Sequence, residues 1–332
     1  MSPTICVKVE KRSGEITIRI LKNHNMINQE YRVYNDEEYV YIPINEETSK
    51  EELTSILDKH KIDFQIVSCS PPKKEKRTLP KHVPSYDLLG DIIIVRSNVL
   101  KNIGLEELIN TLRKLNPRIK AIYMKHETID SYRLPKLELI WGKPVEEVIV
   151  KEYGLKFKIL LGKVYYNKRL SEEHRRIANL CKDGEVVMDL FSGIGGFAIH
   201  IASLRKSIVF ANDLNPYAYQ CILDNISLNK KFLKGIIIPI KINALFFTEL
   251  KPLHGLFDRV IANLPHNSLE FKRVYDVLLK NKGILHLYVV SKNPDEIVRI
   301  LRKWDNYVLM GYRRVLDYAP YTFIYRFDLL KK

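Results

Sequence analysis

The segment from Val186 to Phe197 constrains the fold of this chain more than any other part of the sequence. It reads Val-Val-Met-Asp-Leu-Phe-Ser-Gly-Ile-Gly-Gly-Phe: an apolar run ends in an acid, and a glycine-rich turn leads into an apolar helical pattern. Open α/β sheets bind nucleotides at such strand ends. Glycine lets the backbone approach a ligand closely, and the next helix begins with unpaired N–H groups. The segment therefore predicts a nucleotide-type site at the carboxyl end of a buried strand.

Alternating strand and helix patterns continue on both sides of this segment. A helix is expected from Ser171, with Ser171 as its N-cap, and two terminal strands at 306–315 and 321–329 are expected to join through 316–320. Alternation of this kind predicts a mostly parallel sheet covered by helices, here with a terminal hairpin added. Its strands are expected at 185–189, 207–212, 235–240, 258–263 and 284–290.

The part before Ser171 divides into two smaller units. Residues 1–70 are expected to form a small α/β unit, with strands at 16–20, 39–43 and 63–67 and a helix at 50–60. Residues 71–84 contain prolines followed by a lysine-rich run, which predicts a linker. Residues 85–170 form a middle unit with a strand at 91–95, a helix at 105–115, and alternating runs at 137–141, 157–161 and 163–166.

Composition narrows the class of protein. A chain of 332 residues favours two or three domains, and a net charge of +15 favours nucleic acid as partner over a merely solvated basic surface. No apolar run reaches membrane-spanning length and no signal peptide is evident, so a cytoplasmic protein without membrane contact is expected. The cysteines are far apart, which argues against a zinc site and a disulfide framework and fits a reduced cytosol: Cys6, Cys69, Cys181 and Cys221.

Two further strand ends extend the predicted ligand site. Asp213 ends the second apolar strand, where a carboxylate can accept both ribose hydroxyl hydrogens of a nucleoside, although either acid alone could simply cap a helix. Gly193 and Gly195 belong to a G-x-G-G pattern rather than G-x-G-x-x-G, which disfavours a dinucleotide. After the third strand, the side-chain carbonyl of Asn243 can accept an adenine amino group.

A second group of residues predicts a substrate site. Asn263 and Pro265 follow the fourth strand, where a rigid turn can present an amide to a planar base, although a turn-stabilising Asn is the alternative. Glu173 lies in the first turn of the helix that starts at Ser171. Acids favour that position through the helix dipole, so composition alone does not separate a structural Glu173 from a catalytic base.

Five segments in order, 84–92, 133–142, 166–173, 189–195 and 263–265, carry a resemblance to a known family. The chain resembles the archaeal and eukaryotic tRNA (guanine-37 N1)-methyltransferases over essentially its whole length, and it is most similar to the archaeal subgroup. The resemblance implies a class I (Rossmann-like) S-adenosylmethionine-dependent methyltransferase domain at 171–332, a middle α+β RNA-binding domain at 85–170, and a small N-terminal α/β domain at 1–70 that checks the tRNA body.

The same resemblance implies roles for single residues. Glu173 would be the general base, Arg133 would assist near the guanine oxygen, and Asn263 and Pro265 would shape the pocket of the target base. No metal is implied. His174 stands where many relatives carry Arg, and Asn243 where many carry Asp. The residues implied to contact the cofactor are His174, Asp189, Gly193, Gly195, Asp213, Leu214, Asn243, Ala244 and Asn263.

The implied reaction is S-adenosylmethionine-dependent methylation of N1 of guanosine 37 in tRNA. Some members of the archaeal subgroup also methylate C7 of the wyosine precursor 4-demethylwyosine at the same position, and the sequence leaves that second reaction open. The implied partner is tRNA, contacted by a monomer at the anticodon stem-loop and outer corner. Two alternatives stay open: transfer of the cofactor's aminocarboxypropyl arm to a modified guanine in tRNA, and a non-catalytic RNA-binding protein.

Overall fold

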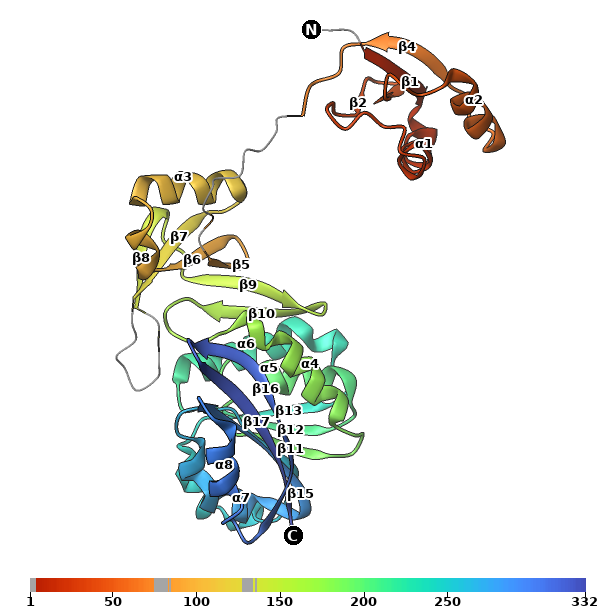
Figure 1. The fold of residues 1–332 in the computed structure, drawn as a ribbon. Coiled ribbons are helices and arrows are strands. Elements are labelled where there is room, and N and C mark those ends of the chain that lie inside the picture. Colours follow the sequence, from red (N-terminus) through yellow and green to blue (C-terminus); the bar gives the residue numbers. More distant parts are fainter. Residues whose placement is uncertain (1–3, 75–82, 84, 127–133, 135) are drawn as a thin grey trace. The chain divides into compact units, whose positions relative to one another are not determined.

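The computed structural model describes residues 4–74, 83, 85–126, 134 and 136–332. The chain consists of two compact units, Met1–Lys81 and His82–Lys332 (Figure 1). The division falls within the segment 71–84 that the sequence suggests as a linker. Each unit has its own buried core.

The first unit is a four-stranded sheet covered by two helices. The strand order is β2-β3-β1-β4, and β1 pairs antiparallel with both β3 and β4. Apolar residues of the sheet and both helices share one core, including Val7, Leu21, Ile42, Leu53 and Leu57. The elements are β1 Thr4–Glu10, α1 Lys11–Asn23, β2 Tyr34–Asn35, β3 Tyr39–Pro43, α2 Lys50–Lys59 and β4 Gln65–Cys69.

Helix α1 replaces the strand that the sequence suggests at 16–20. The run Ile-Thr-Ile-Arg-Ile alternates as a strand would, but the buried positions of α1 are Gly14, Thr17, Ile20 and Leu21, which recur at helical spacing. Ile16 is 49% exposed, so it is not part of an inward strand face. The expectation was wrong because packing of the helical stripe, rather than local alternation, decides the conformation. The expected β3 and α2 are present, and the last strand is shifted to Gln65–Cys69.

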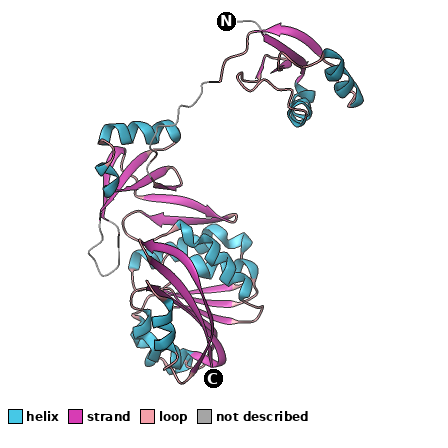
Figure 2. Cartoon of the chain, in the orientation of Figure 1, coloured by secondary structure: helices cyan, strands magenta, loops and turns pink. Residues whose placement is uncertain are grey.

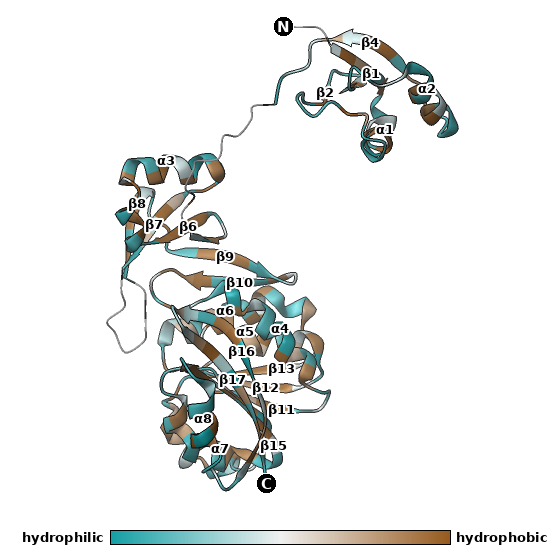
Figure 3. Ribbon diagram, in the orientation of Figure 1, coloured by the Kyte–Doolittle hydropathy of each residue, from teal (hydrophilic) through white to brown (hydrophobic). Residues whose placement is uncertain are grey.

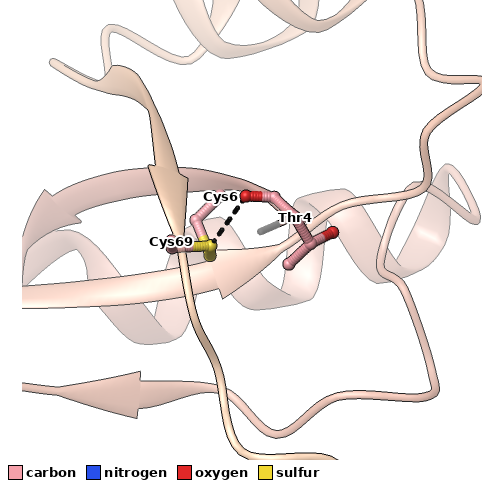
Figure 4. The surroundings of a disulfide bond; sticks show 3 residues. All are labelled: Thr4, Cys6 and Cys69. Atoms are coloured by element: carbon pink, nitrogen blue, oxygen red, sulfur yellow. Dashed lines mark hydrogen bonds between the residues drawn. A yellow bond between two sulfur atoms is a disulfide. The ribbon is translucent and has the colours of Figure 1, made fainter. Parts of the chain in front are cut away.

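A disulfide joins Cys6 of β1 to Cys69 of β4 (Figure 4). The expectation that the distant cysteines form no disulfide is therefore wrong for this pair. The two residues are 63 positions apart, but antiparallel pairing of the first and last strands of the unit brings their Cα atoms to 5.9 Å. Figure 4 also shows the Cys69 sulfur beside the carbonyl oxygen of Thr4. The other two cysteines, Cys181 and Cys221, are free and buried.

The second unit begins with a smaller sheet of order β5-β6-β7-β8. Its helix α3 buries Leu108 and Leu112 against the strands, as its amphipathic pattern predicts. The expected strands at 91–95 and 137–141 and the expected helix are present. The elements are β5 Tyr86–Leu89, β6 Ile92–Arg96, η1 Ser97–Lys101, α3 Leu105–Leu115, β7 Ala121–His126 and β8 Lys136–Gly142.

A hairpin of β9 (Glu147–Glu152) and β10 (Leu155–Leu160) follows and packs on helix α6 (Pro216–Asn229). The amide side chains of Asn225 and Asn229 each bond both the N–H and the C=O of a β10 residue, at distances of 2.6 to 3.2 Å. They satisfy an edge that would otherwise lack partners. The run expected at 163–166 is a turn, with the N–H of Val164 bonded to the carbonyl of Leu160.

The large sheet has the order β13-β12-β11-β14-β15-β17-β16. Neighbours pair in parallel from β13 to β15, whereas β17 is antiparallel to both β15 and β16 (Figure 2). The predicted parallel sheet with a terminal hairpin is confirmed. The connection expected at 316–320 is shorter, because β16 continues to Ala319. The strands are β11 Val186–Asp189, β12 Ile208–Asn212, β13 Ile236–Ile240, β14 Phe257–Ala262, β15 Leu279–Ser291, β16 Tyr307–Ala319 and β17 Thr322–Lys331.

Helices cover both faces of this sheet. Successive residues of β11 point to opposite cores: Val187 packs with α4 and α5, and Met188 packs with α7. Apolar residues accordingly dominate β12 and β13 as well (Figure 3). None of the helices in the described residues combines the length and apolar character needed to cross a bilayer. The helices are η2 Lys168–Leu170, α4 Ser171–Leu180, α5 Gly196–Leu204, η3 Lys230–Phe232, η4 Ala244–Thr248, η5 Lys251–Leu253, η6 Ser268–Phe271, α7 Lys272–Leu278 and α8 Pro294–Leu301.

The Cys6–Cys69 link predicts that reduction selectively destabilises the first unit. Closing a loop of this length in the unfolded chain corresponds to about 4 kcal/mol of stability. We expect the unfolding transition of this unit in the full chain to move to lower temperature in reductant or in Cys69→Ser, as measured by calorimetry. The transition of the second unit, whose cysteines are free, serves as the internal control. An unchanged first transition, or no 6–69 linkage in non-reducing peptide maps, would contradict the disulfide.

Candidate functional site

The carboxyl ends of β13, β12, β11 and β14 form one edge of the large sheet. Because these strands are parallel neighbours, the residues that follow them are brought side by side. Most of the residues suggested by sequence lie at this edge: Asn243 and Ala244 after β13, Asp213 and Leu214 after β12, Asp189, Gly193 and Gly195 at the end of β11, and Asn263 and Pro265 after β14.

The glycine turn after β11 is tied directly to Asp213. Gly193 and Gly195 have left-handed φ angles of 56° and 86°, which other residues rarely adopt. The N–H of Gly193 donates to Oδ2 of Asp213 at 2.8 Å, and the N–H of Asn215 donates to Oδ1 at 2.9 Å. Burial raises the pKa of Asp213 although both backbone bonds oppose the rise. A carboxylate has about four acceptor positions, so it retains capacity for ligand hydroxyl groups.

Asp189 is a fully buried carboxyl group without a hydrogen-bond partner for either oxygen among the described residues. Burial raises its pKa to about 7, and the neighbouring Asp213 adds to the rise, although weaker contacts with the Ser192 side chain and the Ala198 backbone oppose it. An unpaired buried acid is costly, so its retention at a strand end points to a cationic or donor group of a ligand. The ammonium group of an amino-acid moiety has the required charge, and S-adenosylmethionine carries such a group. The residue therefore fits the cofactor that the sequence implies.

Asn243 lies at the start of the 3₁₀ helix η4. Its Oδ1 accepts the N–H of Leu245 at 3.0 Å and caps that helix. This is the same oxygen that is expected to accept an adenine amino group, and its second lone pair is the one available for that contact. Leu214, next to Asp213, is 50% exposed, whereas Ala244 is buried. An apolar side chain and an amide thus stand at neighbouring strand ends.

The turn from Asn263 to Pro265 is held against the neighbouring strand β15. The N–H of Val290 donates to the carbonyl oxygen of Pro265 at 2.8 Å, and the N–H of Ser268 bonds the carbonyl of Leu264. Asn263 is half-buried. The turn therefore presents Asn263 from a backbone that β15 fixes.

Glu173 lies in the first turn of α4, where the sequence suggests it. Ser171 is not the N-cap, as Leu170 holds that position without a side-chain hydrogen bond and the preceding helix η2 is capped by Asn167. The Glu173 side chain is buried, and its Oε1 accepts from the Tyr288 hydroxyl at 2.9 Å and from Nη1 of Arg326 at 2.5 Å.

The contact with Tyr288 places Glu173 at the same level of the sheet as the Asn263 turn. Ala262 pairs with Leu287, so Tyr288 stands one residue further along β15, level with Asn263. The carboxylate on α4 and the amide after β14 are therefore both associated with the carboxyl edge. Arg133 lies outside the described residues.

His174 belongs to a buried polar cluster rather than to an exposed ligand surface. Its Nδ1 lies 2.9 Å from Oε2 of Glu152, and Nε2 of His200 lies 3.0 Å from the same oxygen. The Tyr166 hydroxyl donates to Oε1 of Glu152 at 2.7 Å. Burial alone would raise the pKa of Glu152, but these hydrogen bonds lower it to about 2. Although sequence spacing shows no clustered histidines, the fold gathers two at one carboxylate, where the distances are those of hydrogen bonds.

The cluster also connects α4 to the glycine turn. A Cβ atom on Gly196 would lie 2.5 Å from the His174 ring, so only glycine fits there. The ring also meets Phe197 edge-on at 4.6 Å between centroids. His174 thus packs against the first turn of α5.

Two parts of the chain match known families. Residues 148–309 match the TRM5/TYW2 methyltransferase domain, and residues 6–52 match the tRNA methyltransferase 5 N-terminal domain. A Nanoarchaeum equitans protein named tRNA (guanine(37)-N(1))/4-demethylwyosine(37)-methyltransferase Taw22 is 30% identical over 229 residues, which cover 68% of this chain and 75% of that protein. The chain belongs to the TRM5/TYW2 methyltransferase family.

Further relatives match between three quarters and nearly all of the chain. The Methanocaldococcus jannaschii tRNA (guanine(37)-N(1))-methyltransferase Trm5b is 29% identical, with 98% of each chain covered. The solved complex of aTrm5 with tRNALeu is 28% identical with a TM-score of 0.69, covering 99% of this chain and all of that one. The M. jannaschii TYW2 structure in complex with AdoMet is 26% identical with a TM-score of 0.55, covering 75% of this chain and 100% of that one.

Sequence reasoning missed four side chains around Glu173 and His174: Glu152, His200, Tyr288 and Arg326. His200 carries a weak signal, because it is the one strongly polar side chain in the apolar helix Gly196–Leu204. Arg326 and Asp328 alternate with apolar residues along β17, a pattern that normally indicates a solvent-facing side. Here that face lies under α4, so the signal was misleading.

The unpaired carboxyl of Asp189 predicts an unusual pH dependence of stability. The folded state keeps its proton up to about pH 7, whereas the unfolded chain loses it near pH 4, so this group's contribution to stability falls as pH rises between them. The full effect corresponds to at most about 4 kcal/mol. We expect ligand-free Asp189→Asn to gain stability relative to wild type from pH 4 to pH 8, as followed by denaturant unfolding. A constant difference across this range would refute the assignment.

Proposed function

We propose that this chain transfers the methyl group of S-adenosylmethionine to N1 of guanosine 37 in tRNA. The observation that carries the proposal is the position of Glu173. The carboxylate of Glu173 is buried, and one of its oxygens accepts hydrogen bonds from Tyr288 and Arg326. It lies level with the Asn263 turn, at the edge of the sheet that carries Asp189 and Asp213. Membership of the TRM5/TYW2 family and the match of residues 6–52 to its tRNA methyltransferase N-terminal domain support the same activity.

The cofactor site is assigned by the chemistry of its donors and acceptors. Asp189 would hold the amino group, Asp213 the ribose hydroxyls, and Asn243 with Leu214 and Ala244 the adenine. Gly193 and Gly195 allow the backbone to pass close to the ligand. His174 would act indirectly, through its packing on Gly196. When bound, S-adenosylmethionine supplies an electrophilic methyl group on a sulfonium sulfur.

Glu173 would remove the proton that N1 of guanine carries. As the bond from N1 to the methyl carbon forms and the carbon–sulfur bond breaks, the N1 proton passes to the carboxylate of Glu173. Negative charge that builds on O6 would be stabilised by Arg133, and Asn263 would orient the base by its amide. Alignment of N1 with the methyl carbon supplies much of the remaining rate enhancement.

The tRNA would be held by the strongly basic surface. A net charge of +15 favours phosphate contacts, which makes binding sensitive to salt. Base 37 has to leave the stacked anticodon loop to reach the site, as in other enzymes that modify bases. We also propose that the chain acts as a monomer and contacts the anticodon stem-loop and outer corner.

A second reaction at the same nucleotide is favoured by one similarity. The Nanoarchaeum equitans relative is named for both guanosine-37 and 4-demethylwyosine methylation. The same carboxyl edge would then also accept the tricyclic base for methylation at C7. Transfer of the aminocarboxypropyl arm is less favoured, because the chain carries the N-terminal domain and matches Trm5b along its length.

Nucleoside mass analysis tests the proposed reaction directly. We expect unmodified tRNA transcripts with G37 to gain one methyl group at N1, and transcripts with A37 to gain none. A tRNA carrying 4-demethylwyosine tests the second reaction. A mass gain of the aminocarboxypropyl group, or no product from any of these substrates, would overturn the proposal.

Loss of the carboxylate at Glu173 should remove the chemical step and spare cofactor binding. We expect Glu173→Gln to lower the single-turnover rate by a factor of about 100 or more, as for other general bases. Affinity for S-adenosylmethionine, measured by calorimetry, should stay near the wild-type value. Glu172→Gln is the matched control, because Glu172 is the exposed neighbour in the same helical turn. Equal rates in both variants would exclude Glu173 as the base.

A further inference from the structure

A network of ionic and polar side chains extends from Glu173 beneath helix α4; most of them are buried, and Asp328 and Glu185 are partly exposed. It runs across strands β17, β15 and β14 to the loop after α4, and each contact between successive groups is 3.0 Å or shorter. None of its inner members is used by the proposed chemistry. In order from Glu173, the members are Arg326, Asp328, His286, Arg259 and Glu185.

Arg326 is the group that joins Glu173 to the rest of this network of side chains. It is 3% exposed and donates Nη1 to Oε1 of Glu173 at 2.5 Å and Nη2 to Oδ2 of Asp328 at 3.0 Å. Burial alone would lower the pKa of Arg326, but Glu173, Tyr288 and Asp328 raise it. Its planar guanidinium thus bridges two carboxylates in a fixed orientation.

In the middle of the network, the available hydrogen-bond donors determine which nitrogen of His286 carries the proton. Arg259 can only donate, so its Nη1 bonds an unprotonated Nε2 of His286 at 2.6 Å. The proton of the neutral ring is therefore on Nδ1, which donates to Oδ1 of Asp328 at 2.5 Å. Burial lowers the pKa of His286 although Asp328 opposes the change, in agreement with a neutral ring.

This network of side chains anchors both ends of α4 to the sheet. Arg326 bonds Glu173 in the first turn, and Nη2 of Arg259 donates to the carbonyl of Leu180, the last residue of the helix, at 3.2 Å. Arg259 also makes a two-point contact with Glu185, which follows the helix. The helix therefore has little freedom to rotate about its axis or to slide over the sheet.

The charges of this network are balanced only when Arg176 is included. The network contains three carboxylates, two guanidinium groups and a neutral imidazole, and the guanidinium of Arg176, 4.0 Å from Oε2 of Glu173, offsets the remaining negative charge. Because Asp328 shares Arg326 with Glu173, the guanidinium does not fully neutralise Glu173.

The two oxygens of Glu173 differ in their surroundings. Oε1 accepts from Tyr288 of β15 and Arg326 of β17. Oε2 forms no hydrogen bond among the described residues, and the nearest cation to it there is Arg176 of the same helix, at 4.0 Å. Asp328 is the other charged group on the facing strands, and it is turned toward Arg326.

We propose that Arg326, together with Tyr288, is the positioning residue for Glu173: it fixes Oε1 and leaves Oε2 as the atom that takes the proton from the base. This inference rests on the proposed function, in which Glu173 is the base. In this proposal a residue of β17 sets the orientation of the reacting carboxylate, although the sequence predicts no site residue on that strand.

The test follows the carboxyl carbon of Glu173 by carbon-13 NMR in the full chain, with the signal assigned by its loss in Glu173→Gln. Tyr288→Phe removes one donor to Oε1 without changing the volume much, and Arg326→Gln removes the cation. Each loss disfavours the charged carboxylate, so we expect the titration midpoint to move to higher pH by about one unit or more. Arg313→Lys, an exposed residue paired with Arg326 on β16, is the control and should leave the midpoint unchanged.

The same variants are then compared in single turnover across pH. We expect the acid limb of the pH–rate profile to shift to higher pH, as the titration midpoint does. The plateau rate should be about ten-fold or more lower in Arg326→Gln, because the carboxylate is no longer aligned. Arg326→Lys, which keeps the charge and loses the two-carboxylate bridge, should recover the pH midpoint more than the plateau. A mere loss of folding would lower all rates without moving the limb.

The outcomes separate the two proposals. An unshifted titration midpoint in Tyr288→Phe, which is expected to fold, would overturn the positioning role even if methylation is found. A wild-type chain that makes no methylated guanosine would refute the proposed function, while the titration would still decide whether Arg326 and Tyr288 hold Glu173.

Discussion

Parallel pairing of β11 with β12 and β14 is the constraint on which the rest of the site depends. It places the ends of three strands side by side, so that one glycine turn can bond Asp213 through its own backbone. A shift of register between β11 and β12 would separate Asp189 from Asp213, and a shift between β11 and β14 would move the Asn263 turn away from Asp189. The apolar cores on both faces of the sheet oppose such a shift, and so they also maintain the geometry of the edge.

Buried charged side chains have ionic partners at one place in this domain and lack them at another. Glu173 and His174 are adjacent in sequence, yet each is tied to a separate buried partner, Arg326 and Glu152. These paired contacts fix the first turn of α4 from two directions. Asp189 is equally buried and has no such partner among the described residues. The protein thus satisfies the polar groups that set the position of the helix and leaves unsatisfied the one that fits a ligand.

Features set by local pattern could be predicted, and features set by distant pairing could not. The acid at the end of β11 and the strand–helix alternation around it are visible within a few residues, so the sheet and its edge followed from the sequence. The run 16–20 fits both periodicities, and only packing selects the helix. The Cys6–Cys69 bond and the contacts of Arg326 and Glu152 join residues on separate elements, which no spacing reveals. Resemblance to a family supplied the proposed role of Glu173, which composition could not.

The placement of β17 between β15 and β16 has a consequence for the order in which the sheet is completed during synthesis. Glu173 precedes Arg326 by 153 positions, so a ribosome completes the helix long before the strand that holds it. At about 5–20 residues per second, that interval is on the order of ten to thirty seconds. During this time Glu173 lacks its contact with Arg326, and the sheet lacks the strand that separates β15 from β16. The contact between Glu173 and Arg326 therefore forms only after β17 has been synthesised.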